Sequence, residues 1–224
     1  MNEENVIAVG RQGLLNFFDE VPDASRKHAT SIVSVAGEEL GVALLVHYLA
    51  TQGTQARVIG DCNQGTKSGV RLDAWVEAGS VLYQVEVKNW SAHAIGGRVL
   101  PIDASPGEAA RYRVEMWKNQ WDGEGFTLES VSKVLVPMKP PVQHQNIEPL
   151  IAFWTALHPN GDPEPFFRVS VKGAAFPAVN VFSMSNYLRQ CTGDRLLLHM
   201  PATCRRLRWL STLFSTAAAD AVAG

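Results

Sequence analysis

The chain has 224 residues, of which 46% are hydrophobic and 19% charged, and its formal net charge at pH 7 is −2. This composition is that of a globular protein with a core, and it excludes collagen-like, low-complexity and disordered chains. The near-neutral charge excludes a protein that coats nucleic acid by bulk electrostatic attraction, so any nucleic-acid contact must come from a local patch.

Neither a membrane span nor a secretory signal is indicated. The longest uncharged apolar run, 40–46, is far shorter than the roughly 20 residues that cross a bilayer, and the first residues are acidic where a secretory signal is basic. We therefore expect a cytoplasmic protein without a membrane partner. Cys62, Cys191 and Cys204 lack the spacing of a zinc site or a disulfide framework, which predicts ordinary thiols.

Hydrophobic periodicity, capping residues and turn residues predict helices that alternate with short strands. In chain order we expect a helix at 11–20, a helix at about 25–51, strands at 55–59, 69–77 and 80–90, a loop at 91–106, a helix at 107–121, a strand at 131–136, a helix at 147–157, strands near 166–172 and 178–183, a short helix from Ser185 and a C-terminal helix near 203–219. This alternation favours the α/β or α+β class with a mixed sheet. Because no linker-like segment interrupts the chain, we predict a single domain over 1–224.

The second and third predicted strands form a hairpin whose register follows from its turn. A two-residue loop of Gly79 and Ser80 suits a type II′ turn, and partners across the hairpin then have numbers that sum to 159. One face becomes continuously apolar, with the pairs Val76–Tyr83, Ala74–Val85 and Leu72–Val87. The other face carries the pairs Trp75–Gln84, Asp73–Glu86 and Arg71–Lys88.

The predicted pair of Asp73 and Glu86 points to a cation. Two carboxylates at roughly 5 Å repel by about 3 kcal/mol at an effective dielectric constant near 20, so stability alone does not favour them. A divalent cation reverses the sign, because Mg²⁺ takes oxygen ligands from one or two carboxylates. Lys88 lies on the same side of the sheet by the period of two. The alternative is a solvated face on which Arg71 and Lys88 form ion pairs with these carboxylates.

A glutamate on a preceding helix, an aspartate, and then Glu-x-Lys on the next strand resemble the PD-(D/E)xK nuclease superfamily. The matching residues are Glu38 or Glu39 in AGEELGVALL, Asp73 in RLDAW, and Glu86 and Lys88 in YQVEVKNW. The resemblance covers about residues 30–90. It implies an α/β, restriction-endonuclease-like mixed central β-sheet flanked by helices, with a nuclease-like core at 30–136 and additional strands and helices at 137–224.

The sequence departs from the family pattern in two places. Leu72 stands before Asp73 where the family often has proline, and no Gln-x-x-x-Tyr motif of the exonuclease-like branch follows. The resemblance therefore favours an endonuclease.

The resemblance assigns a role to each matching residue. Asp73, Glu86 and the carbonyl of Val87 would bind Mg²⁺ or Mn²⁺, and Lys88 would position and deprotonate the attacking water. The helix glutamate would orient water or a second metal; Glu38 is preferred to Glu39 because related nucleases often place glycine directly before it, and both stay open.

These roles imply a Mg²⁺-dependent hydrolase that cleaves phosphodiester bonds, in DNA rather than RNA, in a setting of defence or repair. A homodimer or a partner protein of such a system is a further expectation. The rival interpretation is a catalytically inactive member of the same fold that binds nucleic acid or protein within a larger assembly.

Several basic and aromatic residues outside the motif are candidates for nucleic-acid contacts. Arg71, Arg111 and Lys118 are assigned to phosphate binding, while Trp117 and Trp121 either stack on bases or pack on the sheet. Further candidates are Trp75, Trp90, His93 and the cluster of Arg205, Arg206 and Arg208. Ser183 is expected to cap the following helix rather than to take part in chemistry.

Overall fold

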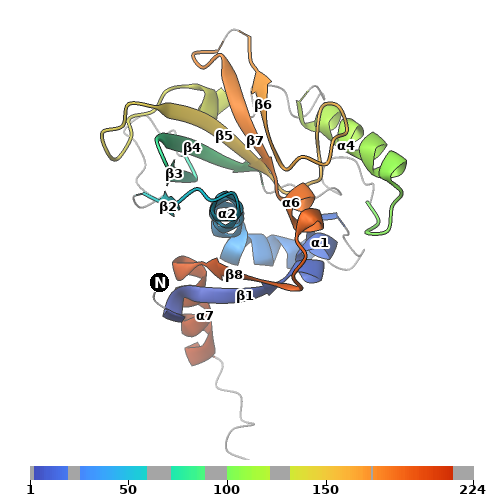
Figure 1. Ribbon diagram of the computed structural model, residues 1–224. Coiled ribbons are helices and arrows are strands. Elements are labelled where there is room, and N and C mark those ends of the chain that lie inside the picture. Colours follow the sequence, from blue (N-terminus) through green and yellow to red (C-terminus); the bar gives the residue numbers. More distant parts are fainter. Residues whose placement is uncertain are drawn as a thin grey trace, which may run out of the picture.

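The computed structural model describes residues 3–19, 26–59, 72–88, 100–121, 132–172 and 174–213 (Figure 1). Its helices are α1 (Arg11–Asp19), α2 (Arg26–Thr51), α4 (Pro106–Trp121), α6 (Met184–Gln190) and α7 (Pro201–Leu213), with short 3-10 helices η1 (Glu3–Asn5) and η3 (Ser132–Leu135). Its strands are β1 (Val6–Gly10), β2 (Ala56–Val58), β3 (Ala74–Ala78), β4 (Val81–Lys88), β5 (Ile147–Phe153), β6 (Phe166–Ser170), β7 (Ala178–Ser183) and β8 (Arg195–His199).

The main sheet is mixed and has the strand order β2-β3-β4-β5-β7-β6. Strand β3 runs antiparallel to both of its neighbours, β2 and β4; β4, β5 and β7 are parallel, and β6 runs antiparallel to β7. Because parallel strands end at the same edge of a sheet, Lys88, Phe153 and Ser183 lie in register there. The predicted mixed central sheet flanked by helices is confirmed.

Two cores fill the two faces of this sheet. Helix α2 packs one face through Leu40, Leu44 and Leu45, and β1 and β8 pair with each other to cover the far side of α2 (Figure 1). Helix α4 packs the opposite face through Met116 and Trp117. The alternation along β5 follows from this arrangement, since Leu150 and Ala152 join the α2 core while Ile151 and Phe153 join the α4 core.

The predicted hairpin register is confirmed over five pairs, from Ala74–Val85 to Ala78–Val81. Gly79 has a φ of +59°, as the first central residue of a type II′ turn requires. This φ is disfavoured for residues with a Cβ, so the glycine fixes the turn and the turn fixes the register.

Two predicted elements are wrong. The segment 131–136, expected as a strand, contains η3, and 147–157, expected as a helix, begins with β5. Strand β5 lies between two parallel neighbours, and its residues from Leu150 to Phe153 are buried and apolar, a run that does not distinguish a strand from a buried helix. Strands β1 and β8 were not predicted, because each is only five residues long and finds its partner at the other end of the chain.

The remaining expected helices and strands are found with shifted ends. The C-terminal helix, expected near 203–219, is described from Pro201 to Leu213. Of the loop expected at 91–106, residues 91–99 lie outside the described residues. Within the described ranges, no helix combines the length and hydrophobicity needed to cross a membrane.

Candidate active site

Asp73 lies where the hairpin ladder ends. The last pair of the ladder is Ala74–Val85, and Asp73 lies in a bend just before it. The N–H of Asp73 donates to the carbonyl oxygen of Val85 at 3.2 Å. Its carboxylate oxygen Oδ2 accepts the N–H of Val87 at 2.6 Å. The bend thus places a carboxylate against the backbone of β4 at the point where no strand residue of β3 remains to pair with it.

The bend also corrects one detail of the predicted faces. Leu72 was expected beside Val87 on the apolar face that packs against α2, but it belongs to the α4 core, whereas Val87 is in the α2 core. The alternation of side chains is therefore broken at Asp73. The regular cross-strand pair of Asp73 and Glu86 is not formed, and it is the bend that brings Asp73 to β4.

Glu86 and Lys88 lie two residues apart on β4 and form a shielded ion pair. The Nζ of Lys88 donates to Oε1 of Glu86 at 2.8 Å, and the two side chains are 14% and 9% exposed. The second oxygen of Glu86, Oε2, is buried and has no hydrogen-bond partner in the described part of the structure. A buried, unsatisfied carboxylate oxygen is costly, so this atom calls for a ligand.

The environment raises the pKa of Asp73 from its ordinary value to about 7. The largest cause is desolvation by burial, followed by the negative charge of Glu86; Glu38 acts in the same direction. The N–H of Val87 and the charge of Lys88 act in the opposite direction. The predicted Glu38, Glu86 and Lys88 therefore lie close enough to Asp73 for their charges to act on its carboxylate, although they come from α2 and β4 and Asp73 from the bend before β3.

The two glutamates at the head of the apolar part of α2 have different tasks. Glu39 accepts the backbone N–H groups of Ala202 at 2.8 Å and Thr203 at 2.6 Å, and also the hydroxyl of Thr203 at 2.6 Å. It therefore caps the N-terminus of α7. Glu38 is the one whose charge reaches Asp73. The geometry favours Glu38 over Glu39 as the helix carboxylate of the site.

Gly41, one turn after Glu38, sets the distance between α2 and the site. A Cβ at this position would lie 2.7 Å from Cε of Met184 and 2.8 Å from Cγ1 of Val87. Only glycine allows this approach without a shift of these side chains. The helix can therefore lie directly against β4 at the residue whose N–H holds Asp73.

Two carboxylates and one carbonyl are available for a cation. Oε2 of Glu86 lacks a partner, and Asp73 has Oδ1 beside the Oδ2 that Val87 already occupies. The carbonyl of Val87 points to the same side of β4 as its N–H, toward the bend. These oxygens suit Mg²⁺ or Mn²⁺. No group of three or more His, Cys, Asp or Glu side chains placed to hold a metal occurs among the described residues.

The predicted phosphate-binding residues on α4 share one shallow hollow. Arg111 and Lys118 are both exposed and line a pocket of about 450 Å³ together with Glu115. Trp117 and Trp121 stack with ring centroids 4.7 Å apart, and Trp117 packs against Phe167. Packing rather than base stacking is thus the role of Trp117.

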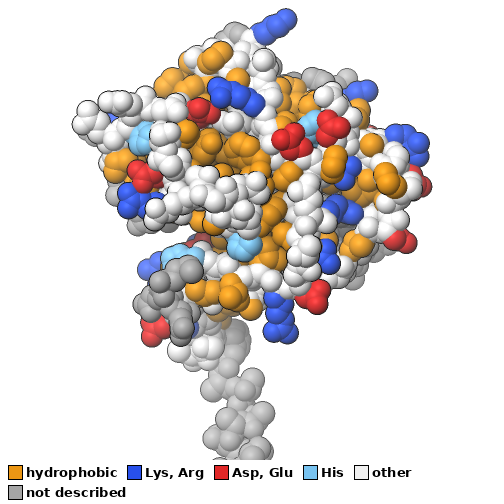
Figure 2. All heavy atoms as spheres, viewed as in Figure 1, with side chains coloured by type: hydrophobic (Ala, Val, Ile, Leu, Met, Phe, Trp, Pro, Cys, Tyr) orange, Lys and Arg blue, Asp and Glu red, His pale blue; other side chains and the backbone are white. Residues whose placement is uncertain are grey.

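The other candidates are distributed over the molecule. Arg71, Trp90 and His93 lie outside the described residues. Trp75 packs against the α4 core. The arginine cluster of α7 is exposed, and Arg208 donates to the carbonyl oxygen of Glu4 at 2.9 Å. Figure 2 shows Lys, Arg, Asp and Glu side chains interspersed around a broad hydrophobic area on the visible face, in keeping with the near-neutral net charge.

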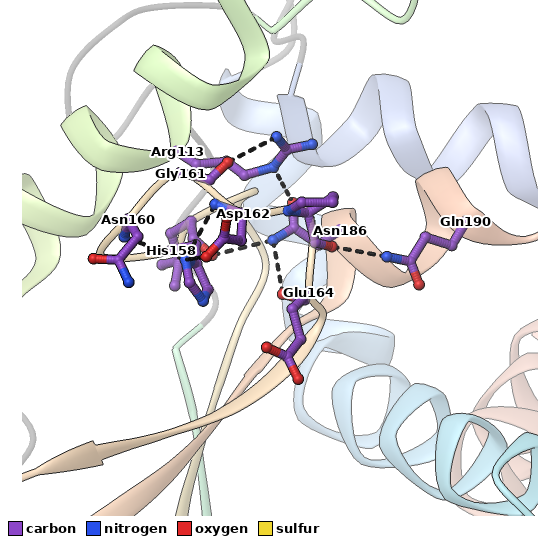
Figure 3. Close-up of polar contacts among 10 residues, drawn as sticks. Arg113, His158, Asn160, Gly161, Asp162, Glu164, Asn186 and Gln190 are labelled. Carbon is purple, nitrogen blue, oxygen red and sulfur yellow. Dashed lines mark hydrogen bonds and ion pairs between the residues drawn. The ribbon is translucent and has the colours of Figure 1, made fainter. Parts of the chain in front are cut away.

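Sequence reasoning missed two sets of polar residues. Gln84 is fully buried on β4, where its amide donates to the carbonyl oxygens of Val134 and Val136 and so anchors η3 to the sheet. Arg113 and Asn186 form a second buried contact (Figure 3). No sequence motif indicates either set, because the bonded partners are at least 50 residues apart in the sequence.

Ser183, predicted as a helix cap, is confirmed as the N-cap of α6, where its hydroxyl accepts the N–H of Asn186.

No protein-family model, curated protein or solved structure significantly matches this chain.

Proposed function

We propose that this protein is a metal-dependent nuclease with a restriction-endonuclease-like fold. It hydrolyses phosphodiester bonds in nucleic acid, with DNA rather than RNA as the substrate. The observation that carries the proposal is the buried Oε2 of Glu86, which has no hydrogen-bond partner in the described structure. The charge of the same carboxylate acts on Asp73. A solvated hairpin face has no need to bury an unsatisfied carboxylate oxygen next to a second carboxylate. The order of helix, strand, hairpin and strand supports the fold part of the proposal.

In this proposal Asp73, Glu86 and the carbonyl of Val87 hold Mg²⁺ or Mn²⁺. The bound cation would supply positive charge beside the phosphate and would acidify water at neutral pH. Its charge would also stabilise the ionised form of Asp73, whose pKa burial and Glu86 now raise.

Lys88 and Glu38 complete the chemistry with their own charges. The ammonium of Lys88, held at Oε1 of Glu86, stabilises negative charge that builds on the phosphate in the transition state. Glu38, on the exposed side of α2, orients the attacking water or a second metal. Arg111 and Lys118 contribute contacts to the nucleic-acid backbone.

The test is cleavage of supercoiled plasmid, linear duplex and single-stranded DNA and RNA in Mg²⁺, Mn²⁺ or EDTA. We expect cleavage in either metal, none in EDTA, and loss of at least 100-fold in rate for Asp73→Asn, Glu86→Gln and Lys88→Met, because each removes a charge at the reacting phosphate. Glu77→Gln is the matched control, since Glu77 lies on β3 in the same hairpin and pairs with Arg57 instead. Wild-type rates that are equal in metal and EDTA would refute the proposal.

One observation favours the rival function of a catalytically inactive binding module. The ion pair between Glu86 and Lys88 already neutralises one of the two carboxylates without a cation. If this is its whole role, the protein binds DNA or a partner protein equally well in metal and in EDTA, and Glu86→Gln changes stability but leaves binding intact. Binding measured by fluorescence anisotropy in the two conditions separates the two functions.

A further inference from the structure

The stretch that contains β8 and α7 concentrates positive charge in a chain whose net charge is negative. Between Asp194 and Asp220 the sequence has four arginines and neither an acidic residue nor a lysine. The whole chain has a formal net charge of −2 and this stretch carries +4, so the remainder carries −6. A local concentration of arginine in such a chain is the charge pattern expected of a site for a polyanion.

The second half of α7 is open to solvent. Thr203 and Cys204 in its first half are buried, whereas every residue from Arg205 to Trp209 is exposed. Figure 1 shows α7 extending below the sheet of β1 and β8, away from the main sheet. Because Glu39 holds the first turn against α2, the helix is fixed to the body at its start and exposes its later turns.

An indole and two guanidinium groups share one exposed side of this helix. Trp209 lies four residues after Arg205, and Arg208 lies three residues after it. Side chains at these spacings are neighbours on a helix surface. The side chain of Trp209 is 61% exposed, although an indole is a large apolar group that folded proteins usually cover.

The charges of these two arginines are not neutralised by an ion pair within the described part of the chain. Arg208 donates to the backbone carbonyl oxygen of Glu4 at 2.9 Å, which is a neutral acceptor. Neither Arg205 nor Arg208 forms an ion pair with another described residue. Both guanidinium groups can therefore bind an anion at the surface.

From this arrangement we infer that α7 binds single-stranded nucleic acid, with phosphates on Arg205 and Arg208 and one base stacked on Trp209. Arginines bind backbone phosphates, and exposed aromatic rings stack on bases. The bases of a duplex already stack on one another, so an exposed indole favours unpaired nucleotides. The choice of nucleic acid as the polyanion rests on the proposed nuclease function.

The position of α7 fits this role, because the helix starts beside the candidate active site. Glu39, which accepts the N–H groups of Ala202 and Thr203, is the neighbour in the chain of Glu38, whose charge acts on Asp73. With 13 residues, α7 is about 20 Å long. A strand held on α7 would therefore lie within a few nucleotides of the carboxylates.

An anionic membrane is the other polyanion that arginine and tryptophan side chains could bind. A helix that lies on a membrane places a broad apolar face in the lipid. In α7 the buried Cys204 belongs to the protein interior, and the exposed Trp209 directly follows Arg208. The exposed side thus mixes charge with one aromatic ring, as nucleic-acid binding requires.

Fluorescence anisotropy in EDTA tests the inference, because binding is then measured without cleavage. The probes are a labelled 20-nucleotide single strand, the duplex of the same sequence, and, in a sedimentation assay, vesicles of phosphatidylcholine with phosphatidylserine. We expect saturable binding of the single strand, at least about fivefold tighter than that of the duplex, because one stacked base contributes about that much. Binding to the vesicles but not to the single strand would overturn the inference.

Variants locate the binding on α7. Trp209→Ala should weaken the single strand about fivefold or more, and Trp209→Phe should retain most of the affinity because it keeps a ring to stack on. Val136→Ala, at an exposed apolar residue next to η3, is the control and should change nothing. An equal loss of affinity for single strand and duplex in Trp209→Ala would overturn the stacking.

Arg205→Gln should weaken the single strand about threefold or more and reduce the slope of log affinity against log salt by about 0.7, as expected for one lost phosphate contact. Arg57→Gln on β2, which removes the same charge elsewhere, should do neither. Equal affinity of the wild type, Arg205→Gln and Trp209→Ala would overturn the inference whether or not the protein cleaves DNA. Absence of cleavage in Mg²⁺ together with α7-dependent binding would refute the nuclease proposal alone.

Discussion

Replacement of Asp73 by asparagine tests the electrostatics of the site without any substrate. In the metal-free protein, burial and the charge of Glu86 raise the pKa of Asp73 from 3.8 to about 7. Because the folded-state pKa is the higher one, the folded protein holds a proton that the unfolded chain has released. The contribution of Asp73 to the stability of the folded protein is therefore fully present below about pH 4 and is lost as the pH rises through about 7.

The magnitude follows from the two values of the pKa. As the pH rises from about 5 to about 8, the titration of Asp73 alone lowers the free energy of unfolding of the wild type by about 2–3 kcal/mol. Asp73→Asn cannot titrate, and its side-chain oxygen can still accept the N–H of Val87. The stability of the variant relative to the wild type should therefore rise by the same about 2–3 kcal/mol over this range.

Urea unfolding in EDTA at several pH values measures the difference directly, since the slope of stability against pH is compared between two proteins that share all other groups. Glu77→Gln, at the far end of β3, serves as the control and should follow the wild type. A constant difference between Asp73→Asn and the wild type across this pH range would refute the electrostatic description of the site.

Three further predictions concern metal, packing and capping. Several millimolar Mg²⁺ or Mn²⁺ at about pH 8 should raise the melting temperature of the wild type, because binding to the folded state stabilises it by mass action. The melting temperature of Asp73→Asn should rise much less. Equal shifts of the two proteins in differential scanning calorimetry would count against Asp73 as a ligand. Gly41→Ala should lower the free energy of unfolding by about 1–3 kcal/mol through overpacking, whereas Gly13→Ala on α1, where a Cβ meets nothing within 4 Å, should be neutral or stabilising; similar urea midpoints for the two variants would contradict the close approach. Glu39→Ala should cost about 1–3 kcal/mol, because three donors at the start of α7 lose their acceptor; hydrogen exchange at the N–H groups of Ala202 and Thr203 should accelerate, and unchanged protection would show that Glu39 is not the cap.

The sequence was most informative where a local rule fixed a long-range result. Gly79 and Ser80 determine the turn, and the turn determines the register of the hairpin. The two-residue period of the strand then places Glu86 and Lys88 on one side of β4. The bend at Asp73 could not be foreseen, because the strand pattern continues through Leu72 without an interrupting residue. At the end of the ladder the Asp73 side chain accepts the N–H of Val87, a tertiary interaction that the local sequence does not reveal.

Elements whose character is set by distant partners were the ones that sequence reasoning misjudged. β5 is a strand because parallel neighbours lie on both sides of it, and its apolar composition alone does not distinguish strand from helix. The choice between Glu38 and Glu39 depended in the same way on a contact absent from the local sequence. Only the position of α7 shows that Glu39 is engaged at a helix end.

The pairing of β1 with β8 has a consequence for the order in which the protein folds. Val6 pairs with His199 and Gly10 with Arg195, so this small sheet joins segments that lie far apart in the sequence. Until residues 195–199 have left the ribosome, β1 has no partner, and the face of α2 that Leu196 and Leu198 cover stays open. Contacts between such distant segments form slowly. The nascent chain therefore exposes an apolar helix face until β8 has been made, and during this time it is open to aggregation and to capture by chaperones.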